Sequence, residues 1–229
     1  MLRAALFDLD GTLVDSAGLI ARCLAETLRG FGYDVAATRV AAGLGPSTPR
    51  VVEALTGAAP GDVETMVETF GRLYASRRAS IAKHPGADAL LDALDEAGVG
   101  LALITNNPEV DVRALLDQLG WGARFAVVLG ADSGAGRKPS AEPALRALAL
   151  LDAGPEEAAF VGDTATDMLC ASDAGIALRV LVGASGGGHG AVPPELPTHV
   201  VADLFEARAL LEGIVAGASA GGAARGRTA

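Results

Sequence analysis

The chain has 229 residues, 50% of them apolar, and a formal net charge of −10 at pH 7. This acidic balance, without a basic stripe, argues against nucleic acid or an anionic membrane as the main partner. No apolar run reaches the roughly 18 residues that a transmembrane helix needs. Cys23 and Cys170 show no disulfide or metal-site pattern, and no signal-like segment precedes the first strand, so we expect a cytoplasmic protein.

The chain begins with a short apolar run, residues 4–7, which predicts a buried parallel strand. Asp8 and Asp10 follow where this strand must end, because Gly11 supplies a turn. Burying two carboxylates together is costly unless a cation or a proton separates them. This segment is therefore the first candidate for a functional site.

Residues 16–84 form a mostly helical block that interrupts the expected series of strands. Helical patterns cover residues 17–30, 48–55 and 62–80. Connections with glycine and proline join them, and no convincing strand pattern is present. Because the block lies between the first and second strands, we predict an inserted domain with joints near residues 14–17 and 83–86.

From residue 85 onward, apolar strand-like runs alternate with helical patterns. The expected strands cover residues 100–104, 125–129, 158–161, 176–182 and 200–201. The expected helices cover residues 87–97, 109–119, 141–151, 164–174 and 204–212. This alternation is typical of a doubly wound sheet, so we assign the chain to the α/β class. Residues 213–229 are rich in glycine and alanine, and we expect a flexible tail there.

Polar segments follow four of the expected strands, at the sheet edge where function gathers in open α/β folds. They are Asp8-x-Asp10, Thr105-Asn106-Asn107-Pro108, Arg137-Lys138-Pro139 and Gly162-Asp163-x-x-x-Asp167. Converging carboxylates indicate a hard divalent cation, and Mg²⁺ fits best because it keeps several waters and accepts phosphate oxygens. Together with the lysine, such a cation would neutralise a phosphoryl group, as phosphoryl transfer requires.

These segments resemble, in order, the four motifs of the haloacid dehalogenase superfamily, in particular its phosphoglycolate phosphatase-like subgroup. The first motif reads Asp-Leu-Asp-Gly-Thr-Leu-Val-Asp-Ser from Asp8, and the resemblance spans roughly residues 4–212. It implies a Rossmann-like three-layer α/β/α core with a mostly parallel sheet and an inserted α-helical cap. The implied domains are residues 1–15 and 85–212 for the core, residues 16–84 for the cap, and residues 213–229 for the tail.

The resemblance also implies a Mg²⁺-dependent phosphatase that hydrolyses a small phosphorylated metabolite, such as phosphoglycolate, through an aspartyl-phosphate. In that reaction Asp8 attacks phosphorus, and Asp10 protonates the leaving alcohol and then activates water. Thr105 and the backbone of Asn106 bind phosphate oxygens. Lys138 links the phosphate to the nucleophile.

The same resemblance implies the metal ligands. These are the carboxylates of Asp8 and Asp163 and the backbone carbonyl of Asp10, with Asp167 either a further ligand or a support for the others. In the helical block, Arg50 lies where relatives place a substrate-facing segment and could bind a substrate carboxylate bidentately. The expected partner is a small phosphate ester, and the sequence gives no oligomeric state.

Two other reactions of the superfamily fit the residues poorly. Haloacid dehalogenation needs no metal, and it gains nothing from Asp10 or Asp163, which are both present. Phosphonate cleavage uses a lysine of the cap to form a Schiff base, and the inserted block contains no lysine before Lys83.

Two alternatives stay open. Sugar phosphomutases of the superfamily usually have valine after the first-motif glycine and a cap histidine about twelve residues after the nucleophile. The corresponding residues here are Thr12 and Ile20, which favours hydrolysis. A non-catalytic phosphate-binding module would be expected to lose Asp8, Asp10 or Lys138, and all three are present.

Overall fold

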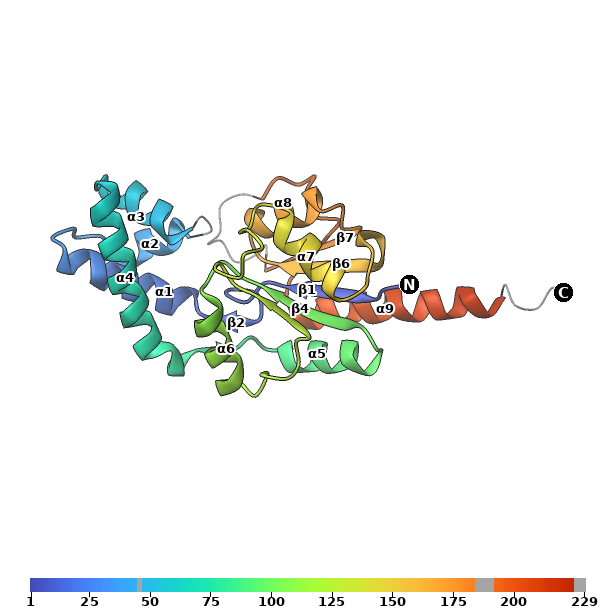
Figure 1. The fold of residues 1–229 in the computed structure, drawn as a ribbon. Helices are drawn as coiled ribbons and strands as arrows, with labels where there is room; N and C mark the ends of the chain where they lie inside the picture. The colour runs from blue at the N-terminus through green and yellow to red at the C-terminus, as the bar shows by residue number, and fades with distance from the viewer. Residues whose placement is uncertain (45–46, 184–191, 225–229) are drawn as a thin grey trace.

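The first strand lies inside a six-stranded parallel sheet, shown by the computed structural model in Figure 1. The structure describes residues 1–44, 47–183 and 192–224. The strands are β1 (Ala4–Phe7), β4 (Gly100–Ile104), β5 (Val127–Leu129), β6 (Ala158–Gly162), β7 (Leu178–Val182) and β8 (His199–Val201). Their order is β5-β4-β1-β6-β7-β8, and every neighbouring pair is parallel, which confirms the predicted α/β class.

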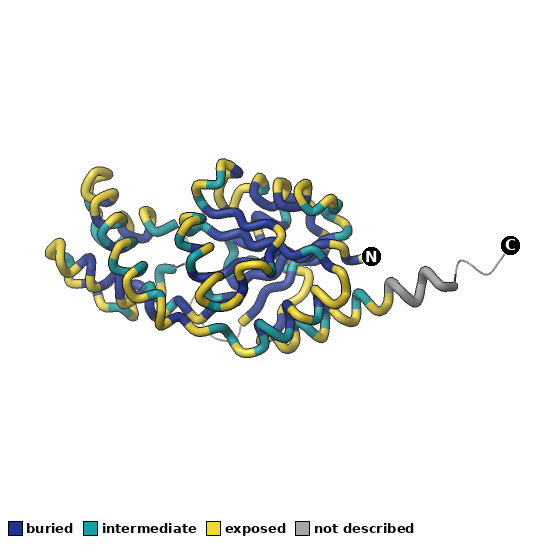
Figure 2. Tube along the Cα trace, turned by 60° about the horizontal axis from the view of Figure 1, so that its bottom comes forward, coloured by how far each residue is buried: buried dark blue, intermediate teal, exposed yellow. Residues whose placement is uncertain are grey.

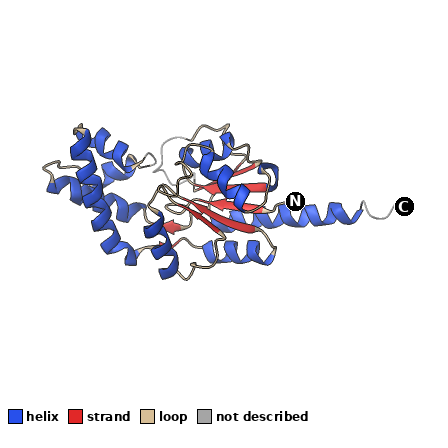
Figure 3. Ribbon diagram, viewed as in Figure 1, coloured by secondary structure: helices blue, strands red, loops and turns tan. Residues whose placement is uncertain are grey.

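Helices cover both faces of the sheet, because the strands are apolar on both sides. Ala5 and Phe7 of β1 pack on one face, whereas Ala4 and Leu6 pack on the other. The first face carries α5 (Ala87–Glu96), α6 (Glu109–Gln118) and α9 (Leu204–Ala224), and the second carries α7 (Glu142–Leu150) and α8 (Ala165–Asp173). Figures 2 and 3 show the buried strands between these helices, which confirms the Rossmann-like three-layer core.

A second group of helices lies beyond one end of the sheet (Figure 1). It comprises α1 (Ala17–Gly30), α2 (Ala37–Ala42), α3 (Thr48–Thr56) and α4 (Pro60–Arg77), followed by a 3-10 turn at Arg78–Ser80. The chain enters through β2 (Val14–Asp15) and returns through β3 (Ala82–Lys83), and these two short strands pair antiparallel. The sequence pattern missed α2 and this pairing, because two-residue strands leave no alternation to read.

The last helix is longer than expected. We predicted that it ends at residue 212 and that a flexible tail follows, but α9 continues to Ala224. The predicted helix end at residue 212 was wrong, because alanine has the highest helix propensity and the glycines between the alanines do not stop the helix. Residues 225–229 lie outside the described part of the chain. Among the described residues, no helix is long and apolar enough to span a bilayer.

Gly130, at the carboxyl end of β5, lets the loop after β4 pass close to the sheet. A Cβ at this position would lie 2.5 Å from the backbone N of Glu109 and 2.7 Å from the backbone O of Asn107. We expect Gly130→Ala to lower the free energy of unfolding by about 1–3 kcal/mol, because backbone atoms cannot give way. Gly30→Ala is the matched control, since a Cβ there meets no atom within 4 Å.

We expect the control to raise stability by roughly 0.5–1 kcal/mol, as alanine does when it replaces a helical glycine. Urea unfolding of both variants measures the difference. Equal stability of the two variants would show that the loop does not depend on a close approach at Gly130.

Candidate active site

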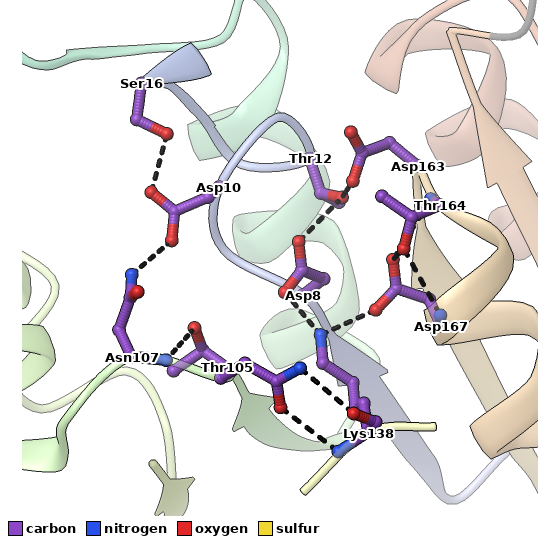
Figure 4. A network of polar contacts seen from close by, with 11 residues as sticks. Asp8, Asp10, Thr12, Ser16, Thr105, Asn107, Lys138, Asp163, Thr164 and Asp167 are labelled. Atoms are coloured by element: carbon purple, nitrogen blue, oxygen red, sulfur yellow. Dashed lines mark hydrogen bonds and ion pairs between the residues drawn. The ribbon is translucent and has the colours of Figure 1, made fainter. Parts of the chain in front are cut away.

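Four buried charged side chains meet where β1 and β6 end (Figure 4). Asp8 follows β1, Asp163 follows β6, Lys138 lies in the loop before α7, and Asp167 lies in the first turn of α8. The Nζ atom of Lys138 lies 2.5 Å from Asp8 Oδ1 and 2.5 Å from Asp167 Oδ1. Segments from residue 8 to residue 167 thus converge on one point, as the strand-end pattern predicted.

The charges at this point do not balance. One ammonium group faces three carboxylates, those of Asp8, Asp163 and Asp167. Burial raises the pKa of Asp8 well above its usual value; Lys138 lowers this pKa, and the neighbouring carboxylates raise it further. Burial lowers the pKa of Lys138, but Asp167 and Asp8 outweigh burial and raise it, so the lysine is a cation. The cluster carries an excess of negative charge that a bound cation would relieve.

The donor set fits a divalent cation such as Mg²⁺. One oxygen atom from each of Asp8, Asp163 and Asp167 lies within 4.8 Å of the others. Carboxylate oxygens are the hard ligands that Mg²⁺ prefers, and the excess negative charge favours a divalent ion. The side chain of Asp10 points away from this group (Figure 4).

The turn after β1 holds Asp163 in place. The Thr12 hydroxyl donates to Asp163 Oδ1 at a distance of 3.0 Å. Gly11 has φ +86°, and a Cβ there would overlap Asp163 Oδ2. Only glycine combines this left-handed backbone with so close an approach, so the first motif needs glycine at this position.

Asp167 is fixed by the start of α8. Its Oδ2 accepts from the backbone N of Thr164 at 3.1 Å and from the Thr164 hydroxyl at 2.5 Å. In return its own backbone N donates to Thr164 Oγ1, which completes a capping box. Thr164, and not Asp163, is therefore the N-cap of this helix. The remaining oxygen of Asp167 is directed at Lys138.

Asp10 forms a separate centre between the sheet and the inserted helices. Its Oδ1 accepts from the Ser16 hydroxyl at 2.5 Å and from the Tyr74 hydroxyl at 3.3 Å, and its Oδ2 accepts from Asn107 Nδ2 at 2.5 Å. Burial raises the pKa of Asp10, and the hydrogen bonds from Ser16 and Tyr74 offset only part of the rise. A carboxyl with a raised pKa is suited to giving up a proton near neutral pH.

The loop after β4 supports the lysine. Asn106 Nδ2 donates to the backbone O of Lys138 at 3.0 Å, and the backbone N of Lys138 donates to Asn106 Oδ1 at 3.1 Å. Thr105 is buried and accepts from the backbone N of Asn107 at 3.2 Å. The amide side chain of Asn106 therefore orients the lysine-bearing segment.

A cavity of about 470 Å³ opens over these groups. Its floor includes Asp8, Asp10, Thr105, Asn106, Lys138 and Asp167, and residues 16–84 contribute Ile20, Leu44, Val67, Phe70, Gly71 and Tyr74. Both halves of the chain thus line one site.

Arg50 is placed elsewhere. Arg50 is exposed on α3 and does not line the cavity. The residues at the start of this helix that line the cavity are Ser47, Thr48 and Pro49. Within the described part of the chain, the lining arginines are Arg78 and Arg137. Tyr74 was not predicted to contact the site, because it lies 64 residues from Asp10 and belongs to none of the four motifs.

Comparisons with known proteins identify the family of this chain. Residues 5–181 match the family described as haloacid dehalogenase-like hydrolase. Phosphoglycolate phosphatase 1 of Pseudomonas aeruginosa is 34% identical over 211 residues, covering 88% of this chain and 77% of the relative. The phosphoglycolate phosphatase of Aquifex aeolicus is 35% identical over 180 residues, covering 76% of this chain and 82% of the relative.

Solved structures share the fold. A predicted phosphoglycolate phosphatase from Haemophilus somnus superposes with a TM-score of 0.81 at 23% identity, over 92% of this chain and 98% of the other. CbbY from Rhodobacter sphaeroides, in complex with phosphate, superposes with a TM-score of 0.75 at 24% identity, over 89% of this chain and 95% of the other. Because the family match spans most of the chain and the relatives are phosphatases, the chain belongs to the haloacid dehalogenase-like hydrolase family and is a phosphatase.

Proposed function

We propose that this phosphatase hydrolyses a small phosphate monoester in two steps, through an aspartyl-phosphate on Asp8 and with Mg²⁺ at the acidic cluster. The observation that carries the proposal is the placement of two carboxyl groups in different environments at one cavity. Asp8 is paired with Lys138, whereas Asp10 lies apart from the cluster and accepts hydrogen bonds from Ser16, Tyr74 and Asn107. Such a pair can divide the roles of nucleophile and acid.

In the first step a carboxylate oxygen of Asp8 attacks phosphorus, and the bond from phosphorus to the ester oxygen breaks. The proton of Asp10 passes to the departing oxygen, which leaves as an alcohol. Lys138 stays protonated beside the nucleophile and stabilises the negative charge on the phosphoryl oxygens. Thr105 and the backbone of Asn106, which line the cavity floor, complete the phosphate site.

In the second step Asp10, now a carboxylate, takes a proton from water as the water oxygen attacks phosphorus. The bond between phosphorus and Asp8 breaks, so that inorganic phosphate forms and both carboxyl groups return to their starting states. Ser16 and Asn107 orient Asp10 for this proton transfer, since each donates to one of its oxygens.

The carboxylates of Asp8 and Asp163 and the backbone carbonyl of Asp10 would hold Mg²⁺. When bound, this ion would neutralise charge on the phosphoryl group and on the acidic cluster. We assign Asp167 mainly to the support of Lys138, because its two oxygens face Lys138 and Thr164.

Residues 16–84 would act as a cap that closes over the core, formed by residues 1–15 and 85–212, and excludes water. Phosphoglycolate, the substrate in the names of several relatives, is the first ester to test. Cys23 and Cys170 are free thiols, which supports a cytoplasmic location. Mutase activity is disfavoured, since Ile20 lines the cavity and cannot transfer a proton.

Replacing the nucleophile should abolish turnover. We expect Asp8→Asn to lower kcat for p-nitrophenyl phosphate in the presence of Mg²⁺ by more than about 10³-fold, because an amide does not attack phosphorus. Absorbance of released p-nitrophenolate measures the rate, and circular dichroism checks the fold. Turnover at the wild-type rate would rule out the aspartyl-phosphate.

Replacing Asp10 should separate the two steps. p-Nitrophenolate can leave without taking up a proton, so the first step should still occur in Asp10→Asn. This variant should therefore release up to one equivalent of p-nitrophenolate in a burst and then stall at the phosphoenzyme. Steady turnover should fall by about 10²–10⁴-fold, because water lacks its general base. Stopped-flow absorbance measures the burst. Undiminished steady turnover would contradict the role of Asp10.

Removing the metal should stop activity and lower stability. Mg²⁺ at roughly 100 times its Kd should stabilise the native state by about 2.7 kcal/mol, because only the folded chain assembles the acidic cluster. We expect Asp163→Asn to lose most of the Mg²⁺-dependent rise in thermal midpoint, whereas Asp62→Asn, at the exposed start of α4, should keep it. Full activity in excess chelator would contradict the metal requirement.

A further inference from the structure

One face of α4 forms a wall of the cavity opposite the phosphate site. Val67, Phe70, Gly71 and Tyr74 line the cavity at spacings of three, four and seven residues from Val67, so they share one side of the helix. Ile20 of α1 extends this wall. Phe70 and Tyr74 stack with their ring centroids 5.7 Å apart. We call this set the α4 wall; none of its members is charged, and the one charged residue of α4 that also lines the cavity among the described residues is a carboxylate, Glu68.

The α4 wall lies beside Asp10, because the Tyr74 hydroxyl donates to Asp10 Oδ1. This step rests on the proposed function, in which Asp10 gives its proton to the departing ester oxygen. The alcohol half of the substrate must then lie between Asp10 and the wall. The chemistry of the wall therefore decides which alcohols bind well.

The two arginines that line the cavity among the described residues each contact a group outside the α4 wall. Arg78 follows α4 and is paired with Asp111 of α6, with 2.9 Å between Nη1 and Oδ1. Arg137 precedes Lys138, and its Nε donates to the backbone O of Ala131 at 3.2 Å. A carboxylate on the alcohol half would face apolar and aromatic side chains and would lose its hydration without gaining an ion pair at the wall.

Gly71 leaves an opening in the α4 wall. A Cβ at this position meets no atom within 4 Å, although Gly71 lies between Phe70 and Tyr74 on the cavity side of the helix. The cavity volume of about 470 Å³ also falls in the range of about 300–1,000 Å³ typical of pockets for larger ligands. A phosphate with a two-carbon chain would leave much of this space empty.

From this geometry we infer that the preferred substrate is the phosphate monoester of an uncharged alcohol that carries an apolar or aromatic group. That group packs on the α4 wall, and the missing side chain at Gly71 sets the largest group that fits. Tyr74 contributes its ring to the wall as well as its hydroxyl to Asp10.

Three esters test this inference with the full-length enzyme and Mg²⁺. Ethyl phosphate and phosphoglycolate share a two-carbon chain and differ by the carboxylate, and benzyl phosphate adds an aromatic ring. We expect kcat/KM for benzyl phosphate to exceed that for ethyl phosphate by about tenfold or more. We expect phosphoglycolate to be no better than ethyl phosphate. A preference for phosphoglycolate over benzyl phosphate would overturn the inference.

Two glycines of α4 supply the variant and its control. Gly71→Leu should fill the opening and lower the ratio of kcat/KM for benzyl phosphate to that for ethyl phosphate by about tenfold or more. Gly61→Leu adds the same side chain at the exposed start of α4, where a Cβ also meets no atom within 4 Å, and should keep the ratio. An unchanged ratio in Gly71→Leu, or an equal fall in both variants, would contradict the role of the wall.

Binding measurements keep this test separate from the proposed chemistry. In the Asp8→Asn background, which cannot form the phosphoenzyme, calorimetry should show tighter binding of benzyl phosphate than of ethyl phosphate. The difference should disappear when Gly71→Leu is added. If no ester is hydrolysed but the difference in binding is present, the proposed reaction is contradicted and the role of the α4 wall is supported. If the esters are hydrolysed but bind with equal affinity, the role of the α4 wall is contradicted and the proposed reaction is supported.

Discussion

The ammonium group of Lys138 is the interaction on which the site depends. It lies 2.5 Å from carboxylate oxygens of both Asp8 and Asp167, in surroundings that bury all three side chains. Carboxylates packed this closely would repel one another and take up protons without a cation among them. Removing one partner of a buried ion pair typically costs about 3–5 kcal/mol. The same group thus stabilises the fold locally and lowers the pKa of the proposed nucleophile, against the effect of burial.

Residues that do not themselves react hold the charged side chains of the cluster in place. Asn106 clamps the backbone of Lys138, and Thr164 holds Asp167 through a capping box. Gly11 leaves room for the carboxylate of Asp163. On the other side of the cavity, Asp10 is held by donors from the core, the joint and the inserted helices. This separation lets two aspartates two residues apart have different environments and different proposed roles.

Much of this arrangement could be read from the sequence. Strong apolar runs predicted the central strands, and the polar segments after them predicted that Asp8, Lys138 and Asp163 meet at one edge. Contacts that depend on how the inserted helices pack could not be predicted. Tyr74 reaches Asp10 from a distant helix, and Arg50 is exposed, because helix orientation is set by tertiary packing. The end of α9 was misjudged since local composition gave no clear stop.

The central claim is that this cluster of carboxylates and one lysine makes Asp8 the acceptor of the phosphoryl group. Mass spectrometry of enzyme quenched in acid during turnover, followed by proteolysis, tests it most directly. The account predicts a phosphoryl adduct on the peptide that contains Asp8, which disappears when substrate is exhausted. An adduct on a different residue, or complete turnover with no adduct at any quench time, would contradict it.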